Sequence, residues 1–323
     1  MTGLLLALLG AVASTNPPAA VSNLVQQTTG IAVSIPATND PVQLALDKLM
    51  ADDDAAQTEV DNWILENQKF VQDGAGISNA EMNRRILKRF APIHSGYEDL
   101  VRRYPKSVDV RVAYASFLND LGEMEEAIQQ LKVAADLNPT NAATWNNLGV
   151  YYSDGHHGPP IEAFPCFEKA VEFNPHEPLY FQNFAVTVFM YRPDAREYYH
   201  IQEPQVFDKA LDLYGRAMRL DPTNFALAVD TAESYYTIRP LRTNDALVAW
   251  TNALNVAQDE LNREEVYIHL ARIKMLAGRY KEARGQLNLV TNDHYITLKT
   301  NLSRALAARE ALAASNAPPE TAK

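Results

Sequence analysis

The side chains best suited to chemistry in this sequence lie in a few short stretches. His156 and His157 are adjacent in SDGHHGPP, and neighbouring side chains diverge too much to share one metal ion, so this stretch is interpreted as a polar loop. Asp52, Asp53 and Asp54 are expected at a helix start, where negative charge is favourable. They lack the alternation and the glycine of a calcium-binding loop. Neither stretch predicts a metal site.

The single cysteine, Cys166, cannot form an internal disulfide, and no CxxC spacing surrounds it. It falls at helical spacing among Phe164, Phe167 and Ala170, which favours a small buried side chain over a catalytic thiol. The chain contains no GxSxG, Walker A, HExxH or GxGxxG motif. We therefore expect a protein that is not an enzyme and that holds no metal or cofactor.

The composition excludes disorder over the whole chain and argues against nucleic-acid binding. Hydrophobic residues make up 47% of the 323 residues, which is enough to build a core. The formal net charge is -11, and no dense Lys/Arg cluster supplies the basic surface that nucleic acid requires. The longest concentration of basic residues, 84–89, is interpreted as the solvated face of a helix.

The N-terminus predicts export. Residues 4–13 form an apolar run as long as the core of a signal peptide, and shorter than the ~20 residues of a membrane-spanning helix. Small residues at 11–13 suit a signal peptidase, although the first Lys or Arg is Lys48 and a basic n-region is missing. We expect a signal peptide over residues 1–13, no integral membrane segment after its removal, and a periplasmic or secreted protein. The alternative is a cytoplasmic protein with an apolar N-terminus.

The rest of the chain is predicted to be helical. Asp40 before Pro41 is typical of an N-cap and a first helical residue, and Ser78 with Glu81 is typical of a capping box. No run of Val, Ile and Thr alternates with polar residues between turn signals, so no strand is expected.

An internal repeat organises this helical region. The string LNPTN at residues 137–141 recurs as LDPTN at 220–224, with FNPHE at 173–177 between them. One series of prolines is spaced by 34, 36 and 47 residues: Pro105, Pro139, Pro175 and Pro222. A series of alanines is spaced by 36, 47, 36 and 37 residues: Ala127, Ala163, Ala210, Ala246 and Ala283. Both series fit a unit of 34 residues with loop insertions.

The stretch TWNNLGVYYS, residues 144–153, shows what one unit is made of. Its apolar side chains and its glycine occur at i, i+3, i+4 and i+7 of one helix: Trp145, Leu148, Gly149 and Tyr152. A second helix has the same kind of spacing and is closed by a proline: Ala163, Phe167, Ala170 and Pro175. This pattern of Trp-x-x-Leu-Gly-x-x-Tyr, Ala-x-x-x-Phe and Pro resembles the signature of the tetratricopeptide repeat (TPR).

The resemblance implies an all-α fold, similar to that of bacterial exported TPR-repeat proteins. The expected architecture is a right-handed superhelical solenoid of antiparallel helix pairs, with about five units and a degenerate half-unit. Each pair must stack on its neighbours, because it cannot bury its apolar face alone. The expected divisions are a signal peptide, a disordered linker, a helical N-terminal extension, the TPR array, a capping helix and a disordered tail: residues 1–13, 14–40, 41–92, 93–295, 296–313 and 314–323.

The resemblance also implies where a ligand binds. In each first helix, the face opposite the core face is expected to be free, and stacking lines up these faces along a concave groove. The expected peptide-binding residues are Asn147, Val150, Gln182, Asn183, Val186, Asp230, Glu233, Tyr236, His269 and Arg272. Asn147 and Asn183 are expected to hold a peptide backbone, and Asp230 and Glu233 to favour a basic residue.

Two hypotheses for the function follow. The favoured hypothesis is a non-enzymatic scaffold that binds a peptide or protein segment in this groove. The protein is expected to be a monomer and not to bind nucleic acid. The alternative is a structural subunit or assembly factor of a cell-envelope or secretion complex. The insertion at residues 191–205 also has two interpretations: its aromatic side chains pack back over the array, which is favoured, or they form a recognition flap.

One kind of ligand is predicted not to bind. Some cytosolic TPR proteins grip the C-terminal carboxylate of heat-shock chaperones with two lysines, two asparagines and an arginine on successive first helices. The matching positions here are Val112, Ser116, Asn147, Leu179 and Asn183, of which only Asn147 agrees. Because no cation remains to hold a carboxylate, calorimetry should detect no binding of an acidic chaperone-tail peptide. Micromolar affinity would contradict this prediction.

Overall fold

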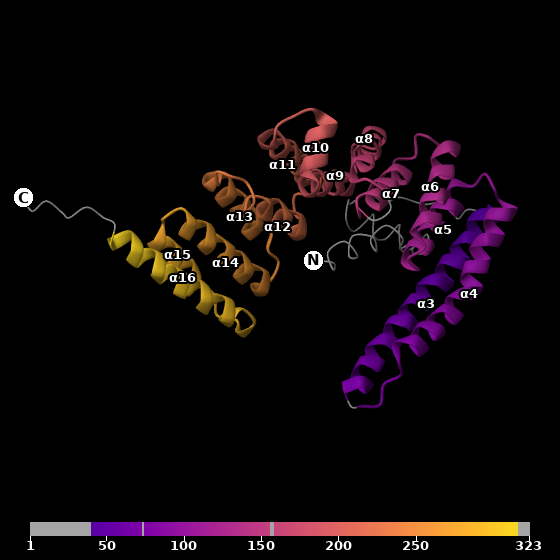
Figure 1. The fold of residues 1–323 in the computed structure, drawn as a ribbon, viewed down its shortest axis with the longest axis horizontal. Helices are drawn as coiled ribbons and strands as arrows, with labels where there is room; N and C mark the ends of the chain where they lie inside the picture. Colours follow the sequence, from indigo (N-terminus) through magenta and orange to yellow (C-terminus); the bar gives the residue numbers. More distant parts are fainter. Residues whose placement is uncertain (1–39, 73, 156–157, 316–323) are drawn as a thin grey trace, which may run out of the picture. The chain divides into compact units, whose positions relative to one another are not determined.

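A computed structural model describes residues 40–72, 74–155 and 158–315. The predicted signal peptide, nearly all of the predicted linker, both histidines of SDGHHGPP and the last eight residues lie outside the described residues. Within the described ranges the chain consists of helices and connecting loops, without a strand (Figure 1). The predicted all-α fold class is confirmed. No described helix combines the length and the apolar composition that a bilayer-spanning segment needs.

The chain divides into two compact units, residues 1–158 and 159–323, called unit 1 and unit 2 below. In unit 1 a long hairpin precedes three shorter helices: α3 (Pro41–Gln72), α4 (Asn79–Arg103), α5 (Val108–Asp120), α6 (Met124–Leu137) and α7 (Ala142–Tyr152). Helices α5 and α6 form an extensive pair. The boundary expected between residues 92 and 93 falls inside α4, so the N-terminal extension and the start of the array share one continuous helix.

Both helices of the hairpin begin where the capping residues predict. The Asp40 carboxylate accepts a hydrogen bond from the Val42 amide at 2.9 Å, and the Ser78 hydroxyl accepts one from the Glu81 amide at 3.2 Å. Each cap satisfies an amide that the first helical turn leaves without a carbonyl partner. These two predicted helix starts are confirmed.

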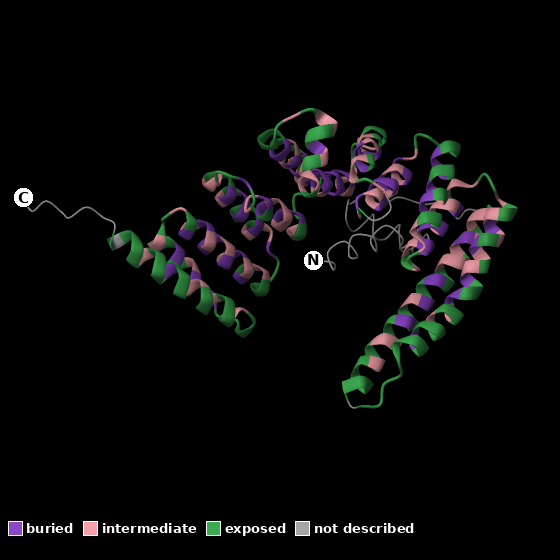
Figure 2. Ribbon diagram, in the orientation of Figure 1, coloured by how far each residue is buried: buried purple, intermediate pink, exposed green. Residues whose placement is uncertain are grey.

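Aromatic rings join the hairpin to α5. The Tyr97 ring on α4 stacks on the Tyr114 ring at 5.6 Å and lies 5.1 Å from the Phe117 ring. Phe90 meets Phe117 edge-on at 5.9 Å. Tyr97 and Phe117 are each 1% exposed, so these contacts are part of the core of unit 1. Figure 2 shows the buried residues of α3 and α4 on their facing sides.

The expectation that Asp53 lies at a helix start is wrong. Helix α3 begins at Pro41, so Asp53 lies well inside it and points towards α4, with 6% exposure. Its carboxylate accepts hydrogen bonds from the Tyr97 hydroxyl at 3.1 Å and from the Gln57 amide at 3.0 Å. The same Gln57 amide donates to Asp120 on α5 at 3.1 Å. Burial raises the pKa of Asp53 to about 6, and the charges of Asp120 and Asp54 add to the rise.

Unit 2 contains the remaining helices. In chain order they are η1 (Pro160–Glu162), α8 (Ala163–Phe173), α9 (Pro178–Met190), α10 (Arg192–Tyr199), α11 (Glu203–Leu220), α12 (Phe225–Ser234), α13 (Thr243–Val256), α14 (Glu260–Leu276), α15 (Tyr280–Asn288), η2 (Asp293–Tyr295) and α16 (Ile296–Ser315). Helix α9 pairs with α11, α12 with α13, and α14 with α15 (Figure 1). Cys166 on α8 is buried, as its spacing predicts.

The insertion at residues 191–205 folds as the short helix α10 and a turn, in which His200 adopts a left-handed backbone conformation. The rings of Tyr198 and Tyr199 lie 5.5 and 5.7 Å from the Phe164 ring on α8. The Tyr198 hydroxyl donates a hydrogen bond to Glu168 at 3.0 Å. The interpretation that these aromatics pack back over the array is therefore confirmed.

A buried carboxylate ties the last helix to α14. Glu264 is fully buried and accepts hydrogen bonds from the Thr291 amide and hydroxyl, at 3.0 and 2.8 Å, and from the Asn292 amide at 2.7 Å. Burial alone would raise the pKa of Glu264, but these hydrogen bonds outweigh it and hold the pKa below its ordinary value. Beyond this loop, Leu306 of α16 completes a cluster with Ala283 and Leu287 of α15.

The buried Asp53 generates a prediction about stability and pH. Its folded-state pKa lies above the ordinary value of 3.8, so the carboxyl group stabilises the fold below about pH 4, and this contribution is lost as the pH rises through about 6. Asp53→Asn keeps the shape and removes the buried charge. We expect this variant to be more stable than the parent at pH 7, by on the order of 1–3 kcal/mol, and to show no difference near pH 4.

Thermal unfolding between pH 4 and pH 7 measures this effect. Asp52→Asn is the matched control, because Asp52 is the preceding residue of α3 and is exposed. It should change the stability by less than about 0.5 kcal/mol at either pH. A loss of stability in Asp53→Asn at pH 7 would show that the ionised carboxylate is needed there.

Candidate peptide-binding face

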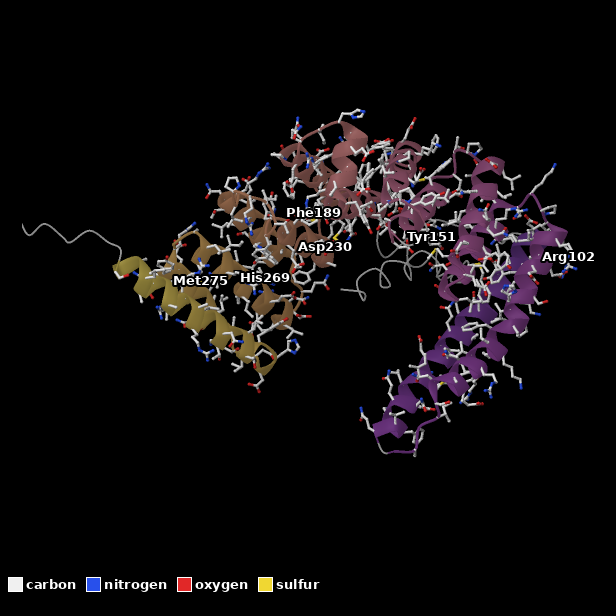
Figure 3. All side chains as sticks on the ribbon, viewed as in Figure 1. Arg102, Tyr151, Phe189, Asp230, His269 and Met275 are labelled. Carbon is white, nitrogen blue, oxygen red and sulfur yellow. The ribbon has the colours of Figure 1, made fainter. Side chains whose placement is uncertain are left out.

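Eight of the ten predicted binding residues lie in unit 2, on the three first helices α9, α12 and α14. We call them the first-helix face: Gln182, Asn183 and Val186 on α9, Asp230 and Glu233 on α12, Tyr236 just after α12, and His269 and Arg272 on α14. Figure 3 labels Asp230 and His269 on the neighbouring helices α12 and α14. Side-chain contacts join all three helices, so the repeat spacing correctly brings these residues together.

A hydrogen bond joins α9 to α12. The Gln182 amide donates to the Asp230 carboxylate at 2.9 Å. Gln182 and Asn183 are only 8% and 7% exposed, less than the predicted free face implies. The reason is that α9 packs on both α8 and α11 and also reaches α12, so most of its circumference is covered. Asn183 therefore offers little surface to a peptide, while Val186 stays half-buried.

A polar and aromatic stack joins α12 to α14. The Tyr236 hydroxyl lies 3.0 Å from His269 Nδ1 and 3.4 Å from the His269 carbonyl oxygen. The His269 ring stacks on the Trp250 ring of α13 at 4.1 Å, with an angle of 12° between the planes. The Arg272 guanidinium lies 5.5 Å above the Tyr236 ring. Burial, with a smaller contribution from Arg272, lowers the pKa of His269 to about 4, so its imidazole is neutral at pH 7.

Carboxylates dominate the charge of the first-helix face. Burial raises the pKa of Asp230, and the hydrogen bond from Gln182 opposes the rise. Burial also raises the pKa of Glu233, the charges of Asp230 and Glu265 raise it further, and Arg272 opposes them. Three carboxylates therefore share this surface with one guanidinium. Asp230 and Glu265 are half-buried, so their attraction for a cation is stronger than on an open surface, while Glu233 is exposed.

Glu265 and Trp250 belong to this region although the sequence reasoning did not select them. Glu265 precedes His269 by four residues and so shares its side of α14, a signal that the spacing contained. Trp250 stands on a second helix, α13. It is fully buried, yet its ring forms the support of His269.

The other two predicted residues, Asn147 and Val150, lie on α7 in unit 1 and are half-buried. The expected core face of α7 is partly wrong. Leu148 is buried as expected, but Tyr151 is buried instead of Tyr152, and its hydroxyl donates to the Ala115 carbonyl on α5 at 3.3 Å. A helix inside an array packs against the preceding pair as well, and this second contact buries residues that a single apolar stripe does not include.

Trp145 is the clearest departure on α7. Its indole nitrogen donates to the Pro139 carbonyl at 2.7 Å, so the ring covers the turn between α6 and α7 and is not a core residue. Asn146, which precedes the predicted binding residue Asn147, is 2% exposed. The polar residues of α7 are thus divided differently between core and surface than the Trp-x-x-Leu-Gly-x-x-Tyr pattern predicts.

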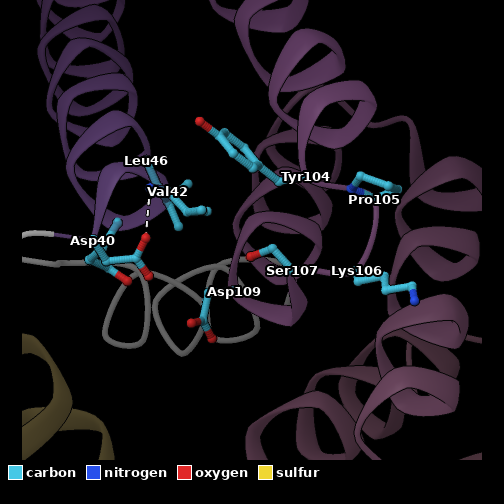
Figure 4. A pocket seen from close by; sticks show the side chains of 9 residues that line it. Asp40, Val42, Leu46, Tyr104, Pro105, Lys106, Ser107 and Asp109 are labelled. Carbon is cyan, nitrogen blue, oxygen red and sulfur yellow. Dashed lines mark hydrogen bonds between the residues drawn. The ribbon is translucent and has the colours of Figure 1, made fainter.

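Two cavities lie elsewhere. One, of about 470 Å³, is in unit 1 beside the start of α3, where Leu46 and Tyr104 face the charged groups of Asp40 and Asp109 (Figure 4). The other, of about 550 Å³, lies in unit 2 among α13, α14 and α15. Neither contains a predicted binding residue. In the described part of the chain, no group of three or more His, Cys, Asp or Glu side chains is arranged to hold a metal ion.

Comparison with known proteins supports the repeat. Residues 117–155 match the family model described as TPR repeat, a stretch that includes α6 and α7. No curated protein matches the chain.

Several solved structures are similar in fold. YrrB, described as a TPR protein with an unusual peptide-binding site, is 14% identical with a TM-score of 0.48, covering 64% of this chain and 97% of YrrB. PilW, a type IV pilus biogenesis factor, is 12% identical with a TM-score of 0.48, covering 76% and 98%. PilF of Pseudomonas aeruginosa is 15% identical with a TM-score of 0.47, covering 78% and 99%.

The stack around Tyr236 generates a prediction about stability. Tyr236→Phe removes the hydroxyl that contacts His269 and keeps the ring on Trp250. We expect a loss of ~1 kcal/mol in the free energy of unfolding, because the buried imidazole loses a hydrogen-bond partner. Denaturant unfolding measures this loss. Tyr280→Phe is the control, since no hydrogen bond of its hydroxyl is found within the described residues, and an equal loss in both variants would contradict the assignment.

Proposed function

Because the chain carries tetratricopeptide repeats, we propose that it is a non-enzymatic interaction scaffold, and that the first-helix face of unit 2 binds an extended segment of another protein. The observation that supports this proposal best is the carboxylate group of Asp230, Glu233 and Glu265 on two adjacent first helices. A face that only covered the core would have no use for the half-buried carboxylates of Asp230 and Glu265, because holding these charges there costs stability.

The proposed ligand is a segment that contains a lysine or an arginine. Its cation would meet Glu233, which is exposed, while Asp230 remains held by Gln182. Tyr236 and Arg272 offer a flat ring and a planar guanidinium beside these acids, and both suit contacts with peptide side chains. Val186 adds an apolar contact. The role first expected for Asn183 passes to these side chains, since its own surface is almost fully covered.

We also propose that the protein works as a monomer in the periplasm or outside the cell. This part depends on the predicted signal peptide over residues 1–13, which lies outside the described residues. A structural or assembly role in a cell-envelope or secretion complex is a finer form of the same proposal, in which the bound segment belongs to another subunit.

A library of extended peptides, screened with the full chain, tests the proposal. Peptides with a central Lys or Arg should be enriched over peptides with a central Glu. For a selected peptide measured by fluorescence anisotropy, Glu233→Gln should weaken binding by ~1 kcal/mol, about fivefold, and added salt should reduce the difference from the parent.

Glu172→Gln is the matched control, because Glu172 is an exposed acid on α8 that belongs to no part of the first-helix face. It should bind the peptide like the parent chain. Enrichment without any preference for a cation, or equal binding by Glu233→Gln and the parent, would remove the first-helix face as the site.

A further inference from the structure

The loop end of the α3–α4 hairpin in unit 1 exposes a group of large apolar side chains. We call it the apolar tip: Leu65 (55% exposed), Phe70 (54%), Val71 (56%), Ile77 (39%) and Leu87 (63%). Figure 2 shows this end of the hairpin as largely exposed. Phe70, Val71 and Ile77 lie at the end itself, while Leu65 and Leu87 lie seven and eight residues along α3 and α4, ~10 and ~12 Å behind it. Scattered exposed apolar residues are ordinary, but three large ones at one hairpin end form a candidate contact surface.

The apolar tip arises from the unequal ends of the two helices. The side of α3 that faces α4 carries Val60, Trp63 and Asn67 at helical spacing, and Phe70 and Val71 continue it by one turn. Helix α4 begins only at Asn79, so it has no turn to cover them. The apolar side of α3 that faces α4 is therefore exposed to solvent in its last turn, at Phe70 and Val71.

Hydrogen bonds connect α3 to the residues that precede α4. The Asn67 side chain accepts a hydrogen bond from the Ile77 amide at 2.8 Å and donates one to the Ile77 carbonyl at 3.2 Å. The Ala75 amide donates to the Phe70 carbonyl at 2.8 Å, which closes the end of α3. A Cβ at Gly76 would lie 2.2 Å from Val71 Cγ2, so glycine is needed for the loop to fold back on Val71. The apolar side chains are thus presented by a fixed scaffold.

Basic residues stand directly behind the apolar tip. Lys69, Arg84, Arg85 and Lys88 are exposed. The Arg85 guanidinium lies 3.7 Å above the Trp63 ring, and Arg84 forms an exposed ion pair with Glu81 at 2.6 Å. With Glu66, Asp73 and Glu81 as its acids, the stretch 65–88 has four basic and three acidic residues, a formal charge of +1 in a chain of -11.

We propose that the apolar tip inserts into the headgroup region of a bilayer that contains anionic lipids. Lys69 lies three residues from the end of α3, and Lys88 nine residues from the start of α4, which places them ~4 and ~13 Å behind the helix ends. Interfacial protein segments bury apolar groups to about 5–10 Å, so Lys69 and Lys88 lie on either side of that depth when Phe70 and Val71 enter the acyl boundary. Their long side chains can extend towards the phosphates from both positions.

The shape and the charge favour a bilayer over a protein partner. The patch is the convex end of a hairpin, and neither of the two cavities described above includes its residues. A soft interface adapts to such an end without a matching pocket. The negative charge of the rest of the chain does not oppose the contact, because charges separated by more than about 10 Å are largely screened at physiological salt.

Flotation of the full-length chain with lipid vesicles tests the proposal. The chain should float with phosphatidylcholine vesicles that contain about 30% phosphatidylglycerol, and should stay behind with pure phosphatidylcholine. Raising the salt from about 50 to 500 mM should weaken the binding. Phe70→Asp and the double variant Lys69→Glu/Lys88→Glu should each lower the bound fraction at least about tenfold, because each removes one of the two attractions.

Matched controls separate the tip from general effects of charge and surface apolarity. Leu298→Asp changes an exposed leucine of α16, and Lys106→Glu/Lys281→Glu gives the same net charge as the tip double variant. Both should bind anionic vesicles like the parent, with unchanged melting temperatures for all variants. The proposal would be overturned if the parent did not bind anionic vesicles at low salt. It would also be overturned if the tip variants and the control variants lost the same fraction of vesicle binding. Concentration-dependent self-association without lipid that Phe70→Asp abolishes would overturn it as well, since the tip would then join two copies of the chain.

Discussion

The fold depends on how closely paired helices approach each other at one position of each unit. The five alanines that mark the repeat in the sequence, Ala127, Ala163, Ala210, Ala246 and Ala283, are all 0–1% exposed. A larger side chain there would push the second helix away, and the apolar residues on either side of the contact would lose their partners. The long side chains of each unit can then fill the remaining space, as Trp250 does beside Ala246 and Ala253.

The sequence was sufficient for the class of fold and for the helix starts, because apolar spacing and capping residues act over one or two turns. It was insufficient where a residue's surroundings come from a helix distant in the chain. Asp53 was placed at a helix start, but it lies inside α3 and contacts Tyr97 of α4. Tyr152 was chosen over Tyr151 because the spacing of one helix does not show that α5 covers its other side. Such second contacts depend on how successive pairs stack, which no single helical pattern contains.

In the candidate site, too, local spacing predicted some features, while others depend on helices distant in the chain. Repeat spacing correctly gathered residues of α9, α12 and α14, since equivalent positions of successive first helices lie side by side. It overestimated the exposure of Asn183 and overlooked the support that Trp250 gives to His269. Function in such a surface depends less on which residues are polar than on how far each is withdrawn from water. The exposure of each side chain is set by how the helices pack. The repeat pattern predicts the general arrangement of the helices, but not the packing around an individual residue.

The Glu264 contact has a consequence for the end of the chain. Terminal helices of repeat arrays normally open first, because they have a neighbour on one side only. Here the loop before α16 is held by a carboxylate 27 residues earlier, and three hydrogen bonds must break before that loop can separate from α14. Separation of the loop that leads into α16 is thereby coupled to the loss of its contacts with α14.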